Sequence, residues 1–191
     1  DAEAALLKPI DEYVGKIQAQ IDELRKDGSD KVRSLKNHIA IVKENKNLTK
    51  EEKSRMIAKD KEALEKAKAV EVSNKDKVSK LIADAEGYLA KHYKNDYYQK
   101  VADSCKAEKE AENAEYKNIC ASIKAEHEQN MSRLSDADEK KDEKYVYKNK
   151  LFDAQMAHES RLQEIKDRKH DAYAHKYHLI DLLRMSRYTF A

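Results

Sequence analysis

Residues 7–24 read LKPIDEYVGKIQAQIDEL, and this stretch decides the class of fold. Its apolar residues recur at alternating intervals of three and four, with charged and amide side chains between them. A heptad pattern of this kind predicts an amphipathic helix that packs against another helix. Pro9 fits the pattern because it falls in the first turns, where a missing N–H costs least. The predicted seam consists of Leu7, Ile10, Val14, Ile17, Ile21 and Leu24.

The composition of the whole chain also favours long helices. Of its 191 residues 40% are charged, and 39 Lys and Arg nearly balance 37 Asp and Glu, yet there are only 3 Gly and 1 Pro. All-β and doubly wound α/β folds need many turns, which are made largely with Gly and Pro. We therefore predict an all-α protein, either an elongated antiparallel helical hairpin or coiled coil, or a slender helical bundle.

Helical spacing of apolar residues continues along the chain and is interrupted at polar stretches. Thr49 and Glu52 form a capping-box pattern, which predicts the start of a helix. At Gly28 the seam shifts by one residue, which indicates a turn or a stutter in one longer helix, and we favour the turn. The sequence thus predicts one elongated helical domain, 1–191, with turns near 28–30, 45–49, 72–74, 95–96 and 135–138.

Residues that could carry chemistry are sparse. No glycine-rich phosphate loop or nucleophile elbow occurs, so we predict neither an enzyme nor a cofactor. Asp171, His175 and His178 share one helix face and resemble a metal-ligand patch. A polar helix flank that happens to contain histidine is the simpler interpretation, and we predict no metal. Cys105 and Cys120 are interpreted as unpaired thiols, which favours a cytoplasmic location, although no targeting segment fixes the compartment.

Two groups of residues are candidates for an interaction patch. Tyrosine is frequent, with 11 Tyr against 2 Phe and no Trp, and Tyr97 and Tyr98 lie beside a predicted turn. Tyr is enriched at interfaces, but it also packs well at half-buried helix seams. The last stretch, 178–191, is apolar and basic, so we expect it to close the bundle, to continue into a larger protein or to lie at a membrane surface. Its patch residues are Leu179, Leu183 and Tyr188.

The function that these patterns favour is a non-enzymatic helical coiled-coil module, acting as a spacer or a protein–protein interaction element with an unspecified protein partner. The alternative is a soluble accessory domain next to the membrane part of a larger protein, such as a transport system, and a third interpretation is a metal-binding helical bundle. No stretch is apolar enough to span a membrane. Because the chain begins at Asp1 without Met, we expect a processed protein or a part of a longer one. The balanced charge argues against nucleic-acid binding, and no oligomeric state is favoured.

Overall fold

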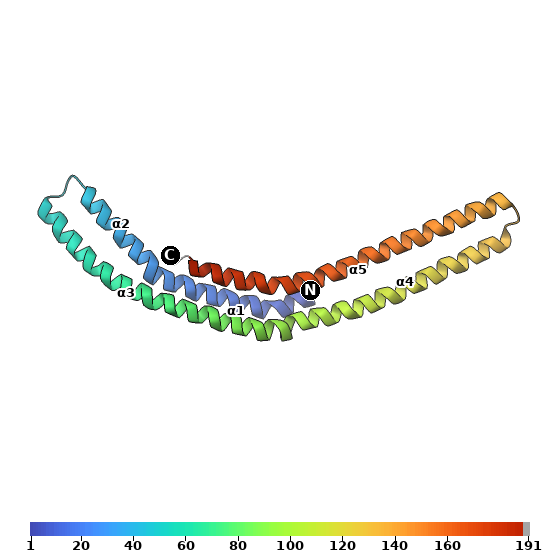
Figure 1. The fold of residues 1–191 in the computed structure, drawn as a ribbon, viewed down its shortest axis with the longest axis horizontal. Coiled ribbons are helices and arrows are strands. Elements are labelled where there is room, and N and C mark those ends of the chain that lie inside the picture. The colour runs from blue at the N-terminus through green and yellow to red at the C-terminus, as the bar shows by residue number, and fades with distance from the viewer. Residues whose placement is uncertain (189–191) are drawn as a thin grey trace. The chain divides into compact units, whose positions relative to one another are not determined.

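The structure of the chain, a computed structural model, describes residues 1–188 and confirms the all-α class (Figure 1). Helix accounts for 95% of the described residues and no strand occurs among them, so the only breaks are two short loops. The α-helices are α1 (Ala2–Arg25), α2 (Lys31–Glu44), α3 (Lys50–Tyr88), α4 (Gln99–Arg133) and α5 (Ala137–Tyr188). Two π-helical segments, η1 (Lys26–Asp30) and η2 (Leu89–Tyr98), connect α1 to α2 and α3 to α4.

The helices form two compact units. Unit 1 comprises residues 1–97 together with the part of α5 from His175 onward, and unit 2 comprises residues 98–174. In unit 1 the end of α5 lies along α1 and α3, since Arg184 Nε is 2.7 Å from Glu86 Oε1 and His175 Nε2 is 3.7 Å from Asp11 Oδ1. The predicted α1 seam is buried there at Ile10, Val14, Ile17 and Ile21. The other buried apolar side chains of this core include Val78, Ile82, Ala85, Leu89, Tyr93, Leu179 and Leu183.

The chain turns at two of the five predicted positions. Thr49 Oγ1 accepts a hydrogen bond from Glu52 N (3.2 Å), and Thr49 N donates to Glu52 Oε2 (2.8 Å), so the capping box starts α3. Between α4 and α5, Asp136 Oδ1 accepts from the backbone N–H of Asp138 at 2.8 Å. These caps satisfy N–H groups that the first turn of a helix leaves without a partner.

The turn favoured near 28–30 is wrong, because the helix winds through it as the π-helical segment η1. A π turn inserts one extra residue, which accommodates the one-residue shift of the apolar seam. Tertiary contacts stabilise this geometry: Asn74 Nδ2 donates to the Leu24 carbonyl (2.9 Å), and Ser29 Oγ donates to Glu71 Oε1 (2.8 Å). The stutter is therefore the correct alternative.

The turns predicted near 72–74 and 95–96 are also wrong. Asn74 caps no new helix, because its side chain is buried against α1 and η1. Asp96 makes no turn, because it lies inside η2, and its carboxylate lies 2.9 Å from His92 Nδ1 one turn earlier in that segment. Tyr93 and Tyr97 are buried with their rings edge-to-face at 5.1 Å, so one side of η2 is held continuously in the core.

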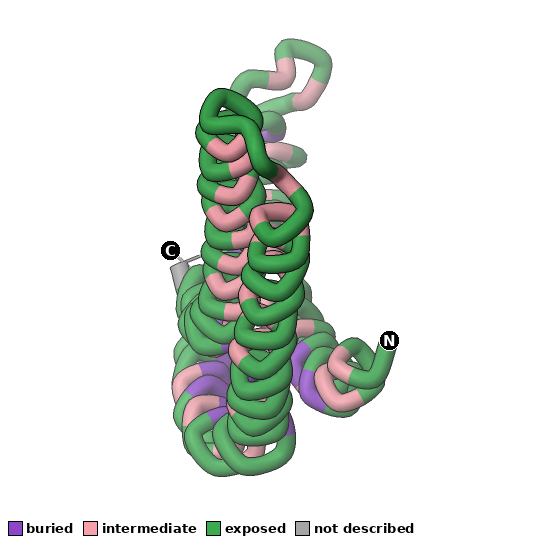
Figure 2. The backbone as a smooth tube through the Cα atoms, turned by 90° about the vertical axis from the view of Figure 1, so that its right-hand side faces the viewer, coloured by how far each residue is buried: buried purple, intermediate pink, exposed green. Residues whose placement is uncertain are grey.

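Unit 2 is an antiparallel pair made by α4 and the first part of α5. It buries Val101, Cys105 and Ala172 at one end, and no described residue between 106 and 171 is buried. Figure 2 shows half-buried residues along the sides where the two helices of this pair face each other. The pair is therefore held by half-buried side chains and not by a closed apolar core.

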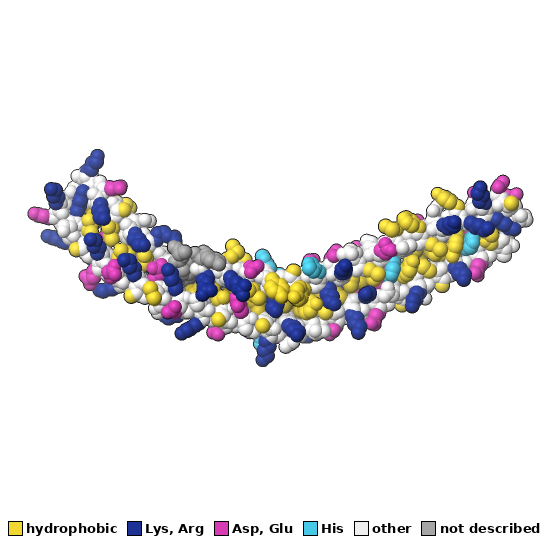
Figure 3. Space-filling model, in the orientation of Figure 1, with side chains coloured by type: hydrophobic (Ala, Val, Ile, Leu, Met, Phe, Trp, Pro, Cys, Tyr) yellow, Lys and Arg dark blue, Asp and Glu magenta, His cyan; other side chains and the backbone are white. Residues whose placement is uncertain are grey.

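Charged side chains of both signs are intermixed on the face that Figure 3 shows. Many pair within one helix at a spacing of four, such as Lys66 Nζ and Glu62 Oε1 at 2.9 Å. Such exposed pairs each contribute little to stability, because water screens their charges. Figure 3 also shows hydrophobic side chains that lie in the open between the charges.

Candidate functional site

Two side-chain clusters of the same composition join α4 to α5 in unit 2. We call each cluster a clamp: a Glu and a Tyr, four residues apart on one helix, enclose a His of the other helix. In the first clamp, Glu112 Oε1 lies 3.1 Å from His158 Nδ1. The Tyr116 ring stacks on the His158 ring, with centroids 4.2 Å apart and an interplanar angle of 5°.

The second clamp repeats this arrangement with the helices exchanged. His127 now comes from α4, and Glu143 Oε1 of α5 lies 3.1 Å from its Nδ1. Tyr147 stacks on the His127 ring at 4.2 Å, and Asn130 Nδ2 donates to the same carboxylate oxygen at 3.3 Å. α4 therefore supplies the Glu and the Tyr of the first clamp, and α5 supplies those of the second. An antiparallel pair allows this exchange, because each helix can present the same motif to the other.

Electrostatics favour the charged form of Glu112, the carboxylate of the first clamp. The hydrogen bond with His158 lowers the pKa of Glu112, and Arg161, whose Nη1 lies 3.1 Å from Glu112 Oε2, lowers it further. Farther along the pair, Arg168 lowers the pKa of Glu108 through a 2.6 Å contact and also donates to Cys105 Sγ at 3.5 Å. These ionisable groups engage one another across the seam, an arrangement suited to holding two helices in register.

The lowered pKa of Glu112 predicts a loss of helix-pair stability in acid. Its folded-state pKa lies below the ordinary value of 4.5, so its contribution is complete above that pH and is lost as the pH falls through the lowered value. We expect the melting temperature of the chain to fall less steeply between about pH 5 and pH 3 in Glu112→Gln than in the unsubstituted chain. Thermal melts followed by circular dichroism measure this. Glu110→Gln, an exposed neighbour, is the control, and identical pH profiles for all three chains would contradict the role of Glu112.

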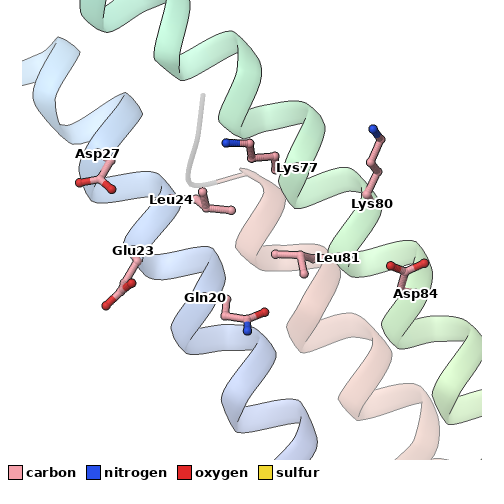
Figure 4. A pocket seen from close by; sticks show the side chains of 8 residues that line it. All are labelled: Gln20, Glu23, Leu24, Asp27, Lys77, Lys80, Leu81 and Asp84. Atoms are coloured by element: carbon pink, nitrogen blue, oxygen red, sulfur yellow. The ribbon is translucent and has the colours of Figure 1, made fainter.

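An open groove of about 440 Å³ lies between α1, η1 and α3 in unit 1 (Figure 4). Leu24 and Leu81 point into it from the two sides. No histidine, cysteine or hydroxyl side chain lines it. Its remaining lining is formed by Gln20, Glu23, Asp27, Lys77, Lys80 and Asp84.

The structure does not assemble the Asp171, His175 and His178 patch into a metal site. Asp171 and His178 are exposed, and the rings of His175 and His178 lie 6.0 Å apart. The nearest carboxylate oxygen to His175 Nε2, from Asp11, is 3.7 Å away. Within residues 1–188 no group of three or more His, Cys, Asp and Glu side chains could hold a metal ion, so the third interpretation gains no geometric support.

The predicted interaction patch consists largely of core residues. Tyr97 is 8% exposed, Leu179 is 5% exposed and Leu183 is fully buried, because α5 packs its apolar face onto unit 1. These three are therefore unavailable as a contact surface. Tyr98 is half-buried and its ring meets Tyr173 edge-to-face at 5.7 Å. The side chain of Tyr188 lies outside the described residues.

Sequence reasoning missed the clamps and the buried amide of Asn74. One signal for the clamps was present, since Glu-x-x-x-Tyr occurs at Glu112–Tyr116 and again at Glu143–Tyr147. Spacing on one helix cannot identify the histidine that comes from the other helix. That pairing needs the register of the hairpin.

Comparison with known proteins places the chain in a family. None of the helices within residues 1–188 combines the length and hydropathy of a transmembrane segment. No curated protein and no solved structure matches the sequence. Over residues 1–191 it matches the family model described as "ABC transporter permease MglC, N-terminal domain". The chain therefore belongs to the family of N-terminal domains of the ABC transporter permease MglC.

Proposed function

We propose that this domain is a non-enzymatic helical module of an ABC transporter permease, acting as a coiled-coil-like spacer and as a contact surface for another protein of the transport system. A permease works in a membrane, so a domain joined to it would lie close to one. The family match supports the transport context. The spacer role rests on one observation, the chain of polar contacts that ties α4 to α5.

These contacts are distributed along the helix pair. Arg168 meets Glu108 near one end, the Glu112 clamp follows, and Lys150 Nζ lies 2.7 Å from Glu126 Oε1 before the second clamp. α4 has 35 residues and so extends about 52 Å at the usual rise per residue. Contacts spread over this length resist sliding and splaying of the two helices, which a spacer requires.

The same observation disfavours catalysis. An active site brings a nucleophile, a base and a stabilising donor toward a shared space where a substrate can sit. In the two clamps the carboxylates and imidazoles instead contact each other, and the tyrosine rings cover the imidazoles. The arrangement supports a mechanical role for these groups.

Shortening the helix pair tests the spacer. Removing residues 117–130 and 142–155 from the complete permease takes two heptads from each helix, about 21 Å, and keeps the remaining seam in register. We expect the shortened protein to stay helical but to lose most of its transport activity, measured as uptake by cells that depend on this transporter.

A length-restored variant is the matched control. Here the two removed segments are replaced by unrelated heptad sequences of equal length that preserve an antiparallel seam. Recovery of uptake would support a spacer whose length matters, and no recovery would point to specific contacts made by the native segments. Normal uptake by the shortened protein would refute the spacer role.

A further inference from the structure

One face of α5 in unit 2 carries large apolar side chains that nothing covers. Tyr145, Phe152 and Met156 are 68%, 61% and 50% exposed, and Asn149 is exposed between them. The four follow one another at intervals of four, three and four, so they form a single line along the helix. We call this line the α5 outer stripe.

The outer stripe lies opposite the seam with α4. The residues of α5 that face α4, such as Tyr147 and His158 of the clamps, fall on the other side of the helix by the 3.6-residue period. None of the four stripe side chains makes a hydrogen bond or ring contact with another residue of the described chain. No described residue between 106 and 171 is buried, yet this helix face exposes large apolar side chains to solvent. Covering these side chains with a partner would add stability.

We propose that the outer stripe packs against the outer stripe of a second copy of this chain, with the two α5 helices parallel. The inference deepens the protein-contact part of the proposed function and rests on it. In heptad terms Tyr145 and Phe152 occupy d positions, and Asn149 and Met156 occupy a positions. In a parallel pair each of these residues lies beside the equivalent residue of the second chain.

Asn149 supplies the first argument for this partner and this direction. A single Asn at an a position in an apolar seam specifies a parallel two-stranded pairing, because the two amides can hydrogen-bond to each other. In an antiparallel pairing centred on the stripe, Asn149 would face Phe152 of the other copy. Its amide would then be covered without a partner, which costs free energy.

Charge complementarity is the second argument. Lys148 and Asp153 flank the stripe on its two sides, at g and e positions, and neither forms an ion pair within the described residues. In a parallel pair the g residue of one helix meets the e residue one heptad further on in its partner, so each Lys148 would meet an Asp153. Antiparallel pairing would place Lys148 near Gln155 and form no such pair.

The length of the stripe limits the strength of the contact. Asp142 and Glu159 occupy the next core positions of the heptad pattern at the two ends of the stripe. In a parallel pair each would face the equivalent carboxylate of the second chain, and the like charges would repel. The apolar contact therefore covers only about two heptads. An interface this small is weak on its own, and it would act between copies that the transport system already holds close together.

Sedimentation of the whole chain, from about 10 µM to about 1 mM, tests the pairing. We expect the mass to rise with concentration from 22.1 kDa toward twice that value. Phe152→Lys should weaken self-association by about tenfold or more. Ile41→Lys, which changes an equally exposed residue on α2, should leave it unchanged.

Charge exchange and cross-linking then test the direction. Lys148→Asp should weaken the dimer, and adding Asp153→Lys should restore it. Asp142→Cys, with Cys105 and Cys120 changed to Ser and folding checked by circular dichroism, should form a disulfide between copies. In an antiparallel dimer the two positions would lie about 25 Å apart and would not link.

Several outcomes would overturn the proposal: a monomer at every concentration, a dimer that Phe152→Lys leaves intact, or no cross-link at position 142. A stripe that binds only a different protein of the transporter would also give the first result. These outcomes are distinguishable from failure of the spacer role, because that role is tested by uptake through the shortened permease, whereas the pairing of the stripe is tested by sedimentation and cross-linking.

Discussion

Leu183→Ala is expected to destabilise unit 1 by about 2–5 kcal/mol. The Leu183 side chain is fully buried where the end of α5 packs onto unit 1. Alanine would remove its buried methyl groups and leave a cavity that the surrounding helices can close only in part. Urea unfolding followed by circular dichroism gives the loss of free energy. Hydrogen exchange should show faster opening of α1 amides, because α1 lies in the same core.

Met185→Ala is the matched control for this substitution. Met185 lies two residues further along α5 and is 64% exposed, so its loss should change the free energy of unfolding by no more than about 0.5 kcal/mol. Equal, small effects of the two substitutions would contradict the placement of Leu183 in the core. They would instead favour the surface patch predicted from the sequence.

Gly28→Ala is expected to destabilise unit 1 by about 1–3 kcal/mol. A Cβ at this position would lie 3.1 Å from Glu71 Cα, a backbone atom of α3. The segment η1 and α3 would have to move apart, and that shift would strain the bonds from Asn74 to the Leu24 carbonyl and from Ser29 to Glu71. The measurement is again the free energy of unfolding in urea.

Gly15→Ala is the internal control, with the opposite sign expected. A Cβ there meets nothing within 4 Å, so only the helix preference of alanine over glycine remains. That preference stabilises a helix interior by roughly 0.5–1 kcal/mol. If both substitutions stabilised the chain to the same extent, the close approach at Gly28 would be refuted.

Local pattern was enough to predict several elements. The α1 seam from Ile10 to Ile21 was correct because a heptad repeat places residues on one face whatever the partner is. The start of α3 was correct because a capping box is a contact between residues three apart. Both features depend only on residues that are close in sequence, so they can be identified before the tertiary structure is known.

The candidate site depended on longer-range contacts, so it was predicted poorly. Asn74 belongs to the turn predicted near 72–74, yet its amide reaches Leu24, 50 positions away. His158 was not singled out, because its partners Glu112 and Tyr116 lie on another helix. Tyr97 and Leu183 were assigned to a surface because amphipathic spacing identifies an apolar face without saying what covers it.

Local sequence patterns were enough to predict that this protein is helical, where α1 presents its apolar face and where α3 begins. Tertiary contacts determine the path of the chain through Gly28, the packing of the end of α5 in unit 1 and the clamps that join α4 to α5. The difference arises because periodicity along a helix is set by its own 3.6-residue turn. Burial and ion pairing, in contrast, are set by whichever helix comes to lie beside it.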